Sequence, residues 1–295
     1  MQNLRPLKLN NIIGQTQVKK CIKVLLATYK RDPMPHMLWT GPPGTGKTTF
    51  ATAVAHECGC KLWQANGGTI QSTKDIMPYL VRIQRGDIFF IDEIHRMNIR
   101  VQESMFTVME DYRYDIARGA KSMDVEPFTL IGATTDVGML LQPFFDRFKH
   151  CFQLSSYDLN EMKELIYMNA DKLRIGITDD AVAGLAKRSR WTPRVANSLL
   201  EWCRDYALSD NKTIIDKDIL EKAMILKGID RYGFNRDDWK YINVLKRAKR
   251  PMGLNTLASA TNIAKITIEN RIEPHLIRCG LIEKTQKGRM LCQQK

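Results

Sequence analysis

The stretch Gly41-Pro42-Pro43-Gly44-Thr45-Gly46-Lys47-Thr48 fits the pattern G-x-x-x-x-G-K-[ST]. Its glycines let the loop turn so that successive backbone N–H groups point at a bound phosphate. Lys47 has the charge and reach for the terminal phosphates, and the Thr48 hydroxyl suits the octahedral oxygen shell of Mg²⁺. The stretch therefore predicts a site for a nucleoside triphosphate with Mg²⁺.

The residues on either side of the loop support this interpretation. Residues 36–40 are typical of a short buried strand, and residues 49–56 of a helix whose positive N-terminus meets the phosphates. Strand, loop and helix thus occur in the order that the motif requires. A glycine-rich loop that matches by chance is the alternative, and this order argues against it.

Length and charge bound the class of protein. The chain has 295 residues, 44% of them hydrophobic, which suits two or three domains with real cores. Its net charge is +13, and residues 230–295 carry fourteen Lys and Arg against six Asp and Glu. Such an excess is typical of proteins that bind nucleic acid, although a basic face exposed only to solvent is the alternative.

The apolar runs, the start of the chain and the cysteines argue against a membrane protein, a secreted protein and a zinc protein. No run approaches the roughly 18 apolar residues of a membrane span, and the start lacks a signal peptide, so we expect a cytoplasmic protein without a membrane segment. The seven cysteines show no repeated C-x-x-C spacing, which favours reduced thiols. Cys58-Gly59-Cys60 with His56 offers a metal-binding alternative, but a zinc site needs four ligands.

Periodicity predicts three parts. Residues 1–156 alternate strand and helix patterns, which predicts an α/β domain with a parallel sheet; runs 87–91 and 128–133 are apolar enough to be central strands. Residues 101–112 predict a helix with Met105, Phe106 and Met109 in the core.

Residues 157–229 predict a small all-helical domain. Residues 230–295 predict three helices, at 239–249, 253–260 and 263–277, and a hairpin at 280–291, the order of a winged helix.

Two carboxylates follow the first of the central runs. Asp92 and Glu93 should lie at the carboxyl edge of the sheet, where ligands of open α/β sheets bind. Asp92 is suited to hold Mg²⁺, and Glu93 to polarise the water that attacks the γ-phosphate. An acidic pair after a strand is usually only a loop, but here it lies 45 residues beyond Lys47 in an α/β frame.

Thr135 and Arg147 each leave two interpretations open. Thr135 follows the strand pattern 128–133 and either positions the γ-phosphate or caps the strand end. Arg147 either reaches a neighbouring subunit's γ-phosphate or makes a local contact, which is an ion pair with Asp146 or packing on Phe148.

These motifs in this order resemble the AAA+ ATPases, and more closely the RuvB family of branch-migration motors. The similar segments span nearly the whole chain: Leu4-Arg5-Pro6, Ile13-Gly14-Gln15, Phe90-Ile91-Asp92-Glu93-Ile94-His95-Arg96, Met109-Glu110-Asp111-Tyr112, Gly132-Ala133-Thr134-Thr135, Thr192-Pro193-Arg194, Gly253-Leu254-Asn255-Thr256-Leu257-Ala258 and Glu273-Pro274-His275-Leu276-Ile277.

The resemblance implies a AAA+ P-loop domain (1–156), a helical lid (157–229) and a C-terminal winged helix (230–295). It implies that the catalytic residues are Lys47, Asp92, Glu93, Thr135 as sensor 1, Arg147 as arginine finger in trans and Arg194 as sensor 2. It also implies that ATP contacts Leu4, Arg5, Gly41, Pro42, Pro43, Gly44, Thr45, Gly46, Lys47, Thr48, Thr49, Tyr157 and Arg194, with Thr48 and Asp92 on Mg²⁺.

By the same resemblance, the winged-helix hairpin contacts DNA through Lys284, Lys287 and Arg289. The sequence departs from the family at three places. Lysine stands at 284 and 287 where arginine is usual, and lysine lacks the planar fork. Phe144-Phe145-Asp146-Arg147-Phe148 stands where Leu-Arg-Asp-Arg-Phe is usual. Residues 115–126 are shorter than the hairpin with which the family grips its junction-binding partner.

The implied function is an ATP-driven motor that forms a homo-oligomeric ring, expected to be a hexamer. It would act on double-stranded DNA and four-way Holliday junctions, with a junction-binding partner of the RuvA type. One alternative is a clamp-loader or replication-initiator ATPase that sits on DNA without translocating. Another is a DNA-binding protein that uses nucleotide only as a switch; the complete set of motif residues argues against it.

Overall fold

The computed structural model describes residues 4–29, 32–115 and 122–292. The chain divides into two compact units, and each is described here by itself. The first comprises Met1–Leu165 with Thr192–Arg194, and the second comprises Ile166–Trp191 with Val195–Lys295. The second unit therefore contains both most of the helical part and the C-terminal part.

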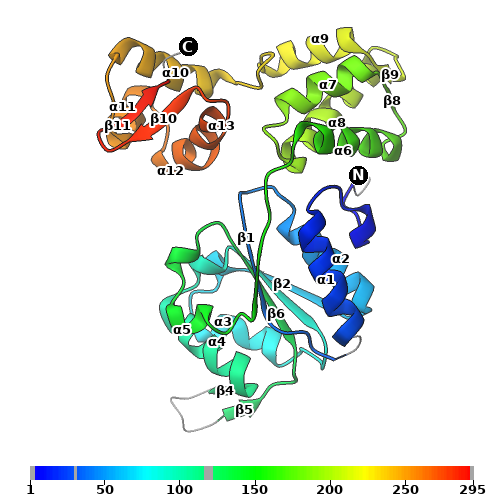
Figure 1. The fold of residues 1–295 in the computed structure, drawn as a ribbon, viewed down its shortest axis with the longest axis vertical. Helices are drawn as coiled ribbons and strands as arrows, with labels where there is room; N and C mark the ends of the chain where they lie inside the picture. The colour runs from blue at the N-terminus through cyan, green and yellow to red at the C-terminus, as the bar shows by residue number, and fades with distance from the viewer. Residues whose placement is uncertain (1–3, 30–31, 116–121, 293–295) are drawn as a thin grey trace. The chain divides into compact units, whose positions relative to one another are not determined.

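The first unit is built on a parallel five-stranded sheet in the order β2-β3-β6-β1-β7 (Figure 1). The two runs predicted as central, at 87–91 and 128–133, form the interior strands β3 and β6. The strands span Met37–Thr40 (β1), Leu62–Asn66 (β2), Ile88–Asp92 (β3), Thr129–Thr134 (β6) and His150–Gln153 (β7).

Helices cover both faces of this sheet (Figure 1). Because side chains alternate along a strand, Met37 and Trp39 of β1 enter one core while Leu38 enters the other. The first core also takes residues of α1 (Thr16–Tyr29) and α2 (Lys47–Cys58), and the second takes residues of α3 (Thr73–Leu80) and α4 (Ile99–Asp111). Shorter elements complete the unit: η1 (Leu9–Asn11), η2 (Gly67–Thr69), η3 (Ile94–Arg96), η4 (Val137–Met139) and α5 (Gln142–Phe145).

Helix α4 confirms two of its three predicted core residues and corrects the third. Met105 and Met109 are buried, four residues apart on one face. Phe106 is only partly buried and lies outside both cores of this unit, because it is rotated by about 100° from Met105 around the helix. Its ring packs instead beneath the guanidinium of Arg147.

After α4 the chain forms a short antiparallel hairpin. Strand β4 (Arg113–Asp115) pairs with β5 (Ser122–Asp124), so that Tyr114 faces Met123. The shortened segment 115–126 noted in the sequence is this hairpin, and its tip, residues 116–121, lies outside the described residues.

The helical part contains α6 (Leu159–Lys172), α7 (Asp179–Arg188), α8 (Pro193–Ser209) and α9 (Lys217–Lys227). Thr178 caps α7 and Pro193 begins α8, as the sequence predicts. The prediction of an all-helical part needs one small correction. Two-residue strands β8 (Gly176–Ile177) and β9 (Ile214–Ile215) pair in parallel and join the loops before α7 and α9.

The C-terminal part is a winged helix with α10 (Arg236–Ala248), α11 (Leu254–Thr261), α12 (Lys265–Thr267), α13 (Glu273–Arg278), β10 (Ile282–Thr285) and β11 (Gly288–Leu291). Helix α10 begins three residues before its predicted start, because Asn235 and Asp238 form a capping box. The single helix predicted at 263–277 is interrupted by the π-helical turn Ile268–Ile272, directly before Pro274, which has no N–H to donate.

Within the described ranges, none of the helices has the length and apolar character needed to cross a lipid bilayer.

Candidate nucleotide site and nucleic-acid interface

The phosphate-binding loop requires its glycines. Gly41, Gly44 and Gly46 all have positive φ angles, the region that other residues rarely adopt. A Cβ atom on Gly41 would also lie 2.2 Å from the carbonyl oxygen of Leu154, which follows β7. The loop is thus fixed by backbone contacts that admit no side chain at this position.

Lys47 is the first residue of α2 and is buried. Its ammonium donates hydrogen bonds to the carbonyl oxygens of Gly41, at 2.8 Å, and Pro42, at 3.1 Å. Burial lowers the pKa of Lys47, Glu93 and Asp92 oppose that shift, and Arg194 adds to it. The sheet edge therefore brings these predicted catalytic charges within electrostatic reach of one another.

Glu93 has an unusual backbone conformation. It follows β3 with φ 49° and ψ 46°, the left-handed region, and its N–H donates to Asp92 Oδ1 at 3.0 Å. The facing backbone at Gly67 leaves room for this turn, since a Cβ there would lie 2.3 Å from the Glu93 carbonyl oxygen. Strained backbone of this kind concentrates at functional sites.

The Glu93 carboxylate faces two side chains that follow neighbouring elements. Thr135, just after β6, donates to Glu93 Oε2 at 3.3 Å, and His95 Nδ1 lies 3.4 Å from the same oxygen. His95 Nδ1 also lies 2.8 Å from the Thr134 hydroxyl, which donates to the carbonyl of Asp136. That hydroxyl therefore accepts from His95, which requires a proton on Nδ1. Thr135 thus contacts the acidic pair, and its two interpretations both stay open.

Two other predicted ligand residues, Arg194 and Tyr157, lie at the loop. Arg194 and Thr192 are the side chains nearest to a Cβ built on Gly44, at 3.5 and 3.3 Å. The buried Tyr157 hydroxyl lies 3.5 Å from the Thr45 carbonyl oxygen, and burial raises the Tyr157 pKa. At the N-terminal end of the described chain, Leu4 is buried and Arg5 is exposed.

Arg147 follows α5, and its ion-pair partner is not the neighbouring Asp146. It pairs with Glu110 at 2.8 Å, and its guanidinium carbon lies 4.4 Å from the centre of the Phe106 ring. Asp146 instead accepts a hydrogen bond from the Gln142 side chain at 2.7 Å. The alternative of an Asp146–Arg147 ion pair is therefore replaced by a contact with α4.

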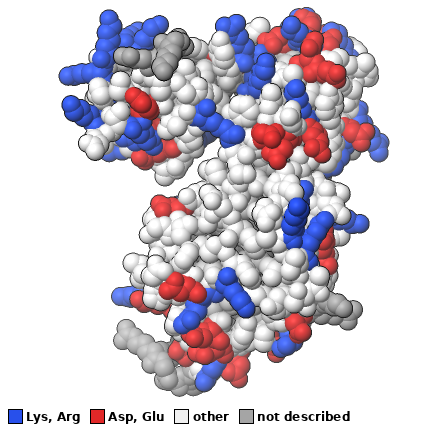
Figure 2. All heavy atoms as spheres, viewed as in Figure 1, with Lys and Arg blue, Asp and Glu red and all other residues white. Residues whose placement is uncertain are grey.

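The predicted DNA-contacting cations differ in their surroundings. Glu273 is fully buried, and its carboxylate contacts Lys284 at 2.7 Å, Arg289 Nε at 2.8 Å and the Tyr241 hydroxyl at 3.0 Å. Lys287 is exposed in the turn between β10 and β11. Figure 2 shows Lys and Arg side chains gathered over the winged helix, at the upper left of the view. The hairpin thus lies in a basic surface, and Lys284 and Arg289, which are paired close to its turn, both bind Glu273.

The metal alternative for Cys58 and Cys60 finds no support in the described ranges. They contain no group of three or more His, Cys, Asp or Glu that could hold a metal ion. All seven cysteines are free, as the sequence predicts.

Sequence reasoning missed four residues of this site: Gly67, His95 as a partner of the acidic pair, Glu110 and Thr192. His95, Glu110 and Thr192 stand inside quoted motifs, but nothing in the motifs tells which side chain they contact. Gly67 follows β2, and only the sheet order β2-β3 puts it beside Glu93.

The fold and the site together define a AAA+ ATPase: a phosphate-binding loop after β1, an acidic pair after the interior strand β3, a helical lid and a C-terminal winged helix. Family models match in the same order. Residues 4–154 match the Holliday junction DNA helicase RuvB P-loop domain, 157–230 the RuvB AAA lid domain and 231–295 the RuvB C-terminal winged helix domain.

Individual relatives agree. A Holliday junction branch migration complex subunit RuvB of Rhodopirellula baltica is 38% identical, over 97% of this chain and 81% of that protein. Its counterpart in Campylobacter fetus is 39% identical, over 98% and 86%. The solved Thermotoga maritima RuvB Holliday junction branch migration motor superposes with a TM-score of 0.89 at 35% identity, over 98% of this chain and 96% of that one. The chain belongs to the RuvB family.

Proposed function

We propose that this chain is an ATP-dependent DNA motor that drives branch migration of Holliday junctions in recombination and repair. The observation that carries the proposal is the meeting of Lys47, the Asp92-Glu93 pair and Arg194 at one sheet edge, in a chain that also has a winged helix. Full-length relatives named as branch migration subunits support it.

The residues of the site fit ATP with Mg²⁺. Lys47 spends two donors on loop carbonyls, which leaves its third for a phosphate oxygen, and the first turn of α2 directs its backbone N–H groups toward the same place. Thr48 and Asp92 supply oxygen ligands of the kind that Mg²⁺ prefers. Residues 41–49 would hold the phosphates, Arg194 would approach them from the lid, and Leu4, Arg5 and Tyr157 would border the adenine.

We assign hydrolysis to the groups around Glu93. Its carboxylate would orient the attacking water and take its proton, while Thr135 would hold that carboxylate or the γ-phosphate in place. The hydrogen bond between Thr135 and Glu93 supports a shared role.

We further propose that the working form is a ring, expected to be a hexamer, in which Arg147 of one subunit completes the site of the next. A guanidinium there would stabilise charge that develops on the γ-phosphate. The division into 1–156, 157–229 and 230–295 would let the winged helix carry DNA while the first part holds ATP. A partner of the RuvA type would hold the junction, and the hairpin β4–β5 is the proposed contact.

Lys284, Lys287 and Arg289 are the proposed contacts to the DNA backbone. Lys287 supports this best, because it is exposed at the turn of the wing. Arg289 and Lys284 would act from a position close to the same turn, where Glu273 orients them.

The test is a strand-exchange assay on a four-way junction with ATP, comparing the wild type with Glu93→Gln. We expect the wild type to move the junction. The variant should bind ATP normally but hydrolyse it at least ~10²-fold more slowly, because it lacks the general base. Junction binding by the wild type that is stimulated by ATP but moves no strand would favour a loader and refute the motor.

A further inference from the structure

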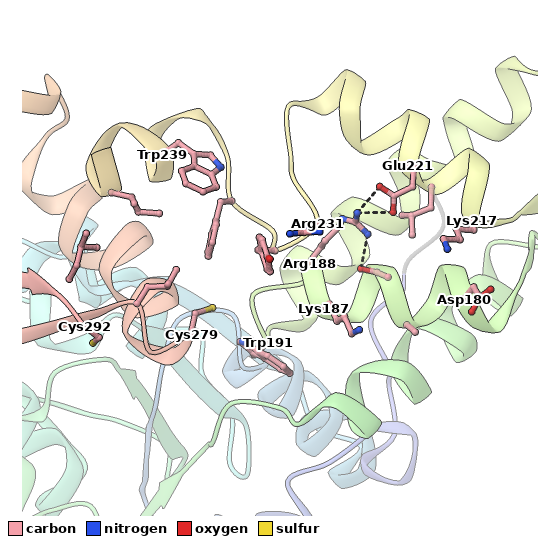
Figure 3. A pocket seen from close by; sticks show the side chains of 18 of the residues that line it. Asp180, Lys187, Arg188, Trp191, Lys217, Glu221, Arg231, Trp239, Cys279 and Cys292 are labelled. Carbon is pink, nitrogen blue, oxygen red and sulfur yellow. Dashed lines mark hydrogen bonds and ion pairs between the residues drawn. The ribbon is translucent and has the colours of Figure 1, made fainter. Parts of the chain in front are cut away.

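The lid and the winged helix, both in the second unit, are joined by a charged and largely buried interface. Arg188, at the end of α7, donates Nε to the carbonyl of Asp230 at 3.0 Å. Its other nitrogens bond Gly184, at 3.3 Å, and both oxygens of Glu221, at 2.8 Å, as the dashed lines in Figure 3 show. Arg188 thus ties the lid helices to the segment that leads into the winged helix.

Arg190 makes the direct connection. Its guanidinium pairs with the fully buried carboxylate of Asp238 in α10. It also donates to the carbonyl oxygens of Gly233, at 3.2 Å, and Arg271, at 3.1 Å. The planar guanidinium therefore holds three separate segments of the winged helix at once, a geometry that a lysine ammonium does not reproduce.

The backbone leaves little freedom at this interface. A Cβ on Gly233 would lie 3.0 Å from both the Cα and the carbonyl oxygen of Arg188, so the two backbone segments are in direct contact. The Arg278 guanidinium of α13 covers the Trp191 ring at 4.9 Å. A buried ion pair surrounded by such contacts favours a single arrangement of the two parts over a range of them.

The same short segment also leads to the nucleotide site. Arg190 and Trp191 have φ angles of 51° and 60°, two successive left-handed residues that turn the chain between α7 and α8. The next residues, Thr192–Arg194, group with the first unit and lie at the phosphate loop. Only Trp191 therefore separates Arg190, which binds the winged helix, from Thr192, which lies at the phosphate loop.

From this arrangement we infer that Arg190 is a positioning residue that couples ATP turnover to DNA movement. A nucleotide-dependent shift at Thr192–Arg194 turns the lid, and the Arg190–Asp238 pair makes the winged helix turn with it as one body. This inference rests on the proposed motor function, and it adds a coupling role to residues that contact neither ATP nor DNA.

The test uses the full chain with ATP and a four-way junction, and measures junction affinity, ATP turnover and migration rate. In Arg190→Lys we expect affinity and turnover within ~2-fold of the wild type and a migration rate at least ~10-fold lower, since coupling mutations act through the link alone. The matched control is Lys187→Ala, an exposed lysine of α7 three residues before Arg190 that should change none of the three.

Asp238→Asn gives an independent second variant. The asparagine side-chain oxygen can still accept from the Asn235 N–H and keep the α10 cap, while the charge toward Arg190 is lost. It should show the same loss of migration per ATP, and the double variant should be no worse than either single one.

Unchanged migration per ATP in both variants would overturn the inference. So would a fall in turnover or junction affinity that accounts for the whole loss of migration, because the residue would then serve a binding site and not the link. A wild type that moves no junction would instead refute the motor function, so the two failures are distinguishable.

Discussion

The Glu110 carboxylate holds the Arg147 guanidinium within the same subunit, at 2.8 Å, above the Phe106 ring. Both side chains are partly exposed, so the pair contributes at most about 1 kcal/mol to stability. The ion pair therefore orients the arginine, yet it can break at a small cost in free energy. That suits the role proposed for Arg147, which is to reach a phosphate of a neighbouring subunit.

Arg147→Ala should therefore lower ATP turnover by about 10³-fold while the unfolding free energy changes by less than ~1 kcal/mol. Mixing this variant with Glu93→Gln should restore part of the activity, because some sites then combine an intact Glu93 with a neighbour's intact Arg147. Steady-state hydrolysis across mixing ratios provides the measurement. If mixtures never exceed the sum of the separate variants, the arginine acts within its own subunit.

Gly67→Ala should impair hydrolysis without touching the nucleotide. The added Cβ would push on the Glu93 carbonyl, now 2.3 Å from that position, and displace the Glu93 carboxylate, which is the proposed general base. We expect kcat to fall at least ~10-fold, ATP affinity to stay within ~3-fold and stability to drop by about 1–3 kcal/mol. Gly253→Ala, where a Cβ meets nothing within 4 Å, is the control. Wild-type turnover by a folded Gly67→Ala protein would show that the Glu93 turn tolerates movement.

Stability should fall with acid through His36. Burial lowers its pKa to about 4, and its Nδ1 accepts a hydrogen bond from the Leu130 N–H at 2.9 Å, which needs the neutral ring. The unfolded chain therefore binds more protons between pH 6.5 and 4, so the unfolding free energy should drop by about 2–3 kcal/mol from pH 7.5 to 4.5.

Denaturant titrations at several pH values measure this loss. His36→Gln should remove the part of that pH dependence that His36 supplies, at the expense of overall stability, while His275, whose pKa burial also lowers to about 4, keeps its own contribution. His56→Gln, at an exposed histidine, should leave the pH dependence intact. If the free energy of unfolding of His36→Gln falls with acid as steeply as that of the wild type, the loss belongs to other groups and not to His36.

The wing should separate affinity from stability. Lys287→Ala should weaken junction binding and reduce the slope of log K against log salt by about 1, with stability within ~0.5 kcal/mol of the wild type. Arg289→Ala should lower the unfolding free energy by about 2–4 kcal/mol, because it leaves the buried Glu273 carboxylate with Lys284 as its remaining cation. Salt-dependent binding measurements and thermal melts test both variants. An equal loss of melting temperature in Lys287→Ala and Arg289→Ala would contradict this separation of affinity from stability.

The sequence predicts the nucleotide site better than the wing because of how each is encoded. Gly41 to Thr48 act within eight residues, and Asp92 and Glu93 end an apolar run, so local pattern and strand order suffice to place them. The Glu273 network joins residues from α10, α13 and both strands of the hairpin, and no spacing encodes which buried carboxylate meets which cation. The sequence therefore predicts Arg289 only as a contact to DNA and not as a partner of the buried Glu273.

The same limit explains the partners of Arg147 and Arg190. Each sits beside an acidic residue or an aromatic in sequence, but its ion-pair partner lies 37 residues earlier in the first case and 48 residues later in the second. The local pattern also misses the π-helical turn at 268–272, because periodicity alone predicts a continuous helix there. The pattern does not include the backbone N–H that Pro274 lacks.

The order of strands has a consequence for how the protein is made. Strand β1, which leads into the phosphate loop, lies between β6 and β7, and Met37 is aligned with Ile131 and His150. Both neighbours are synthesised about 100 residues after β1, a delay on the order of 5–20 s at ~5–20 residues per second. The loop cannot take its final shape on the ribosome before Leu154 emerges to close against Gly41. We expect a nascent chain to acquire nucleotide affinity abruptly and late, when nearly the whole first unit has left the exit tunnel.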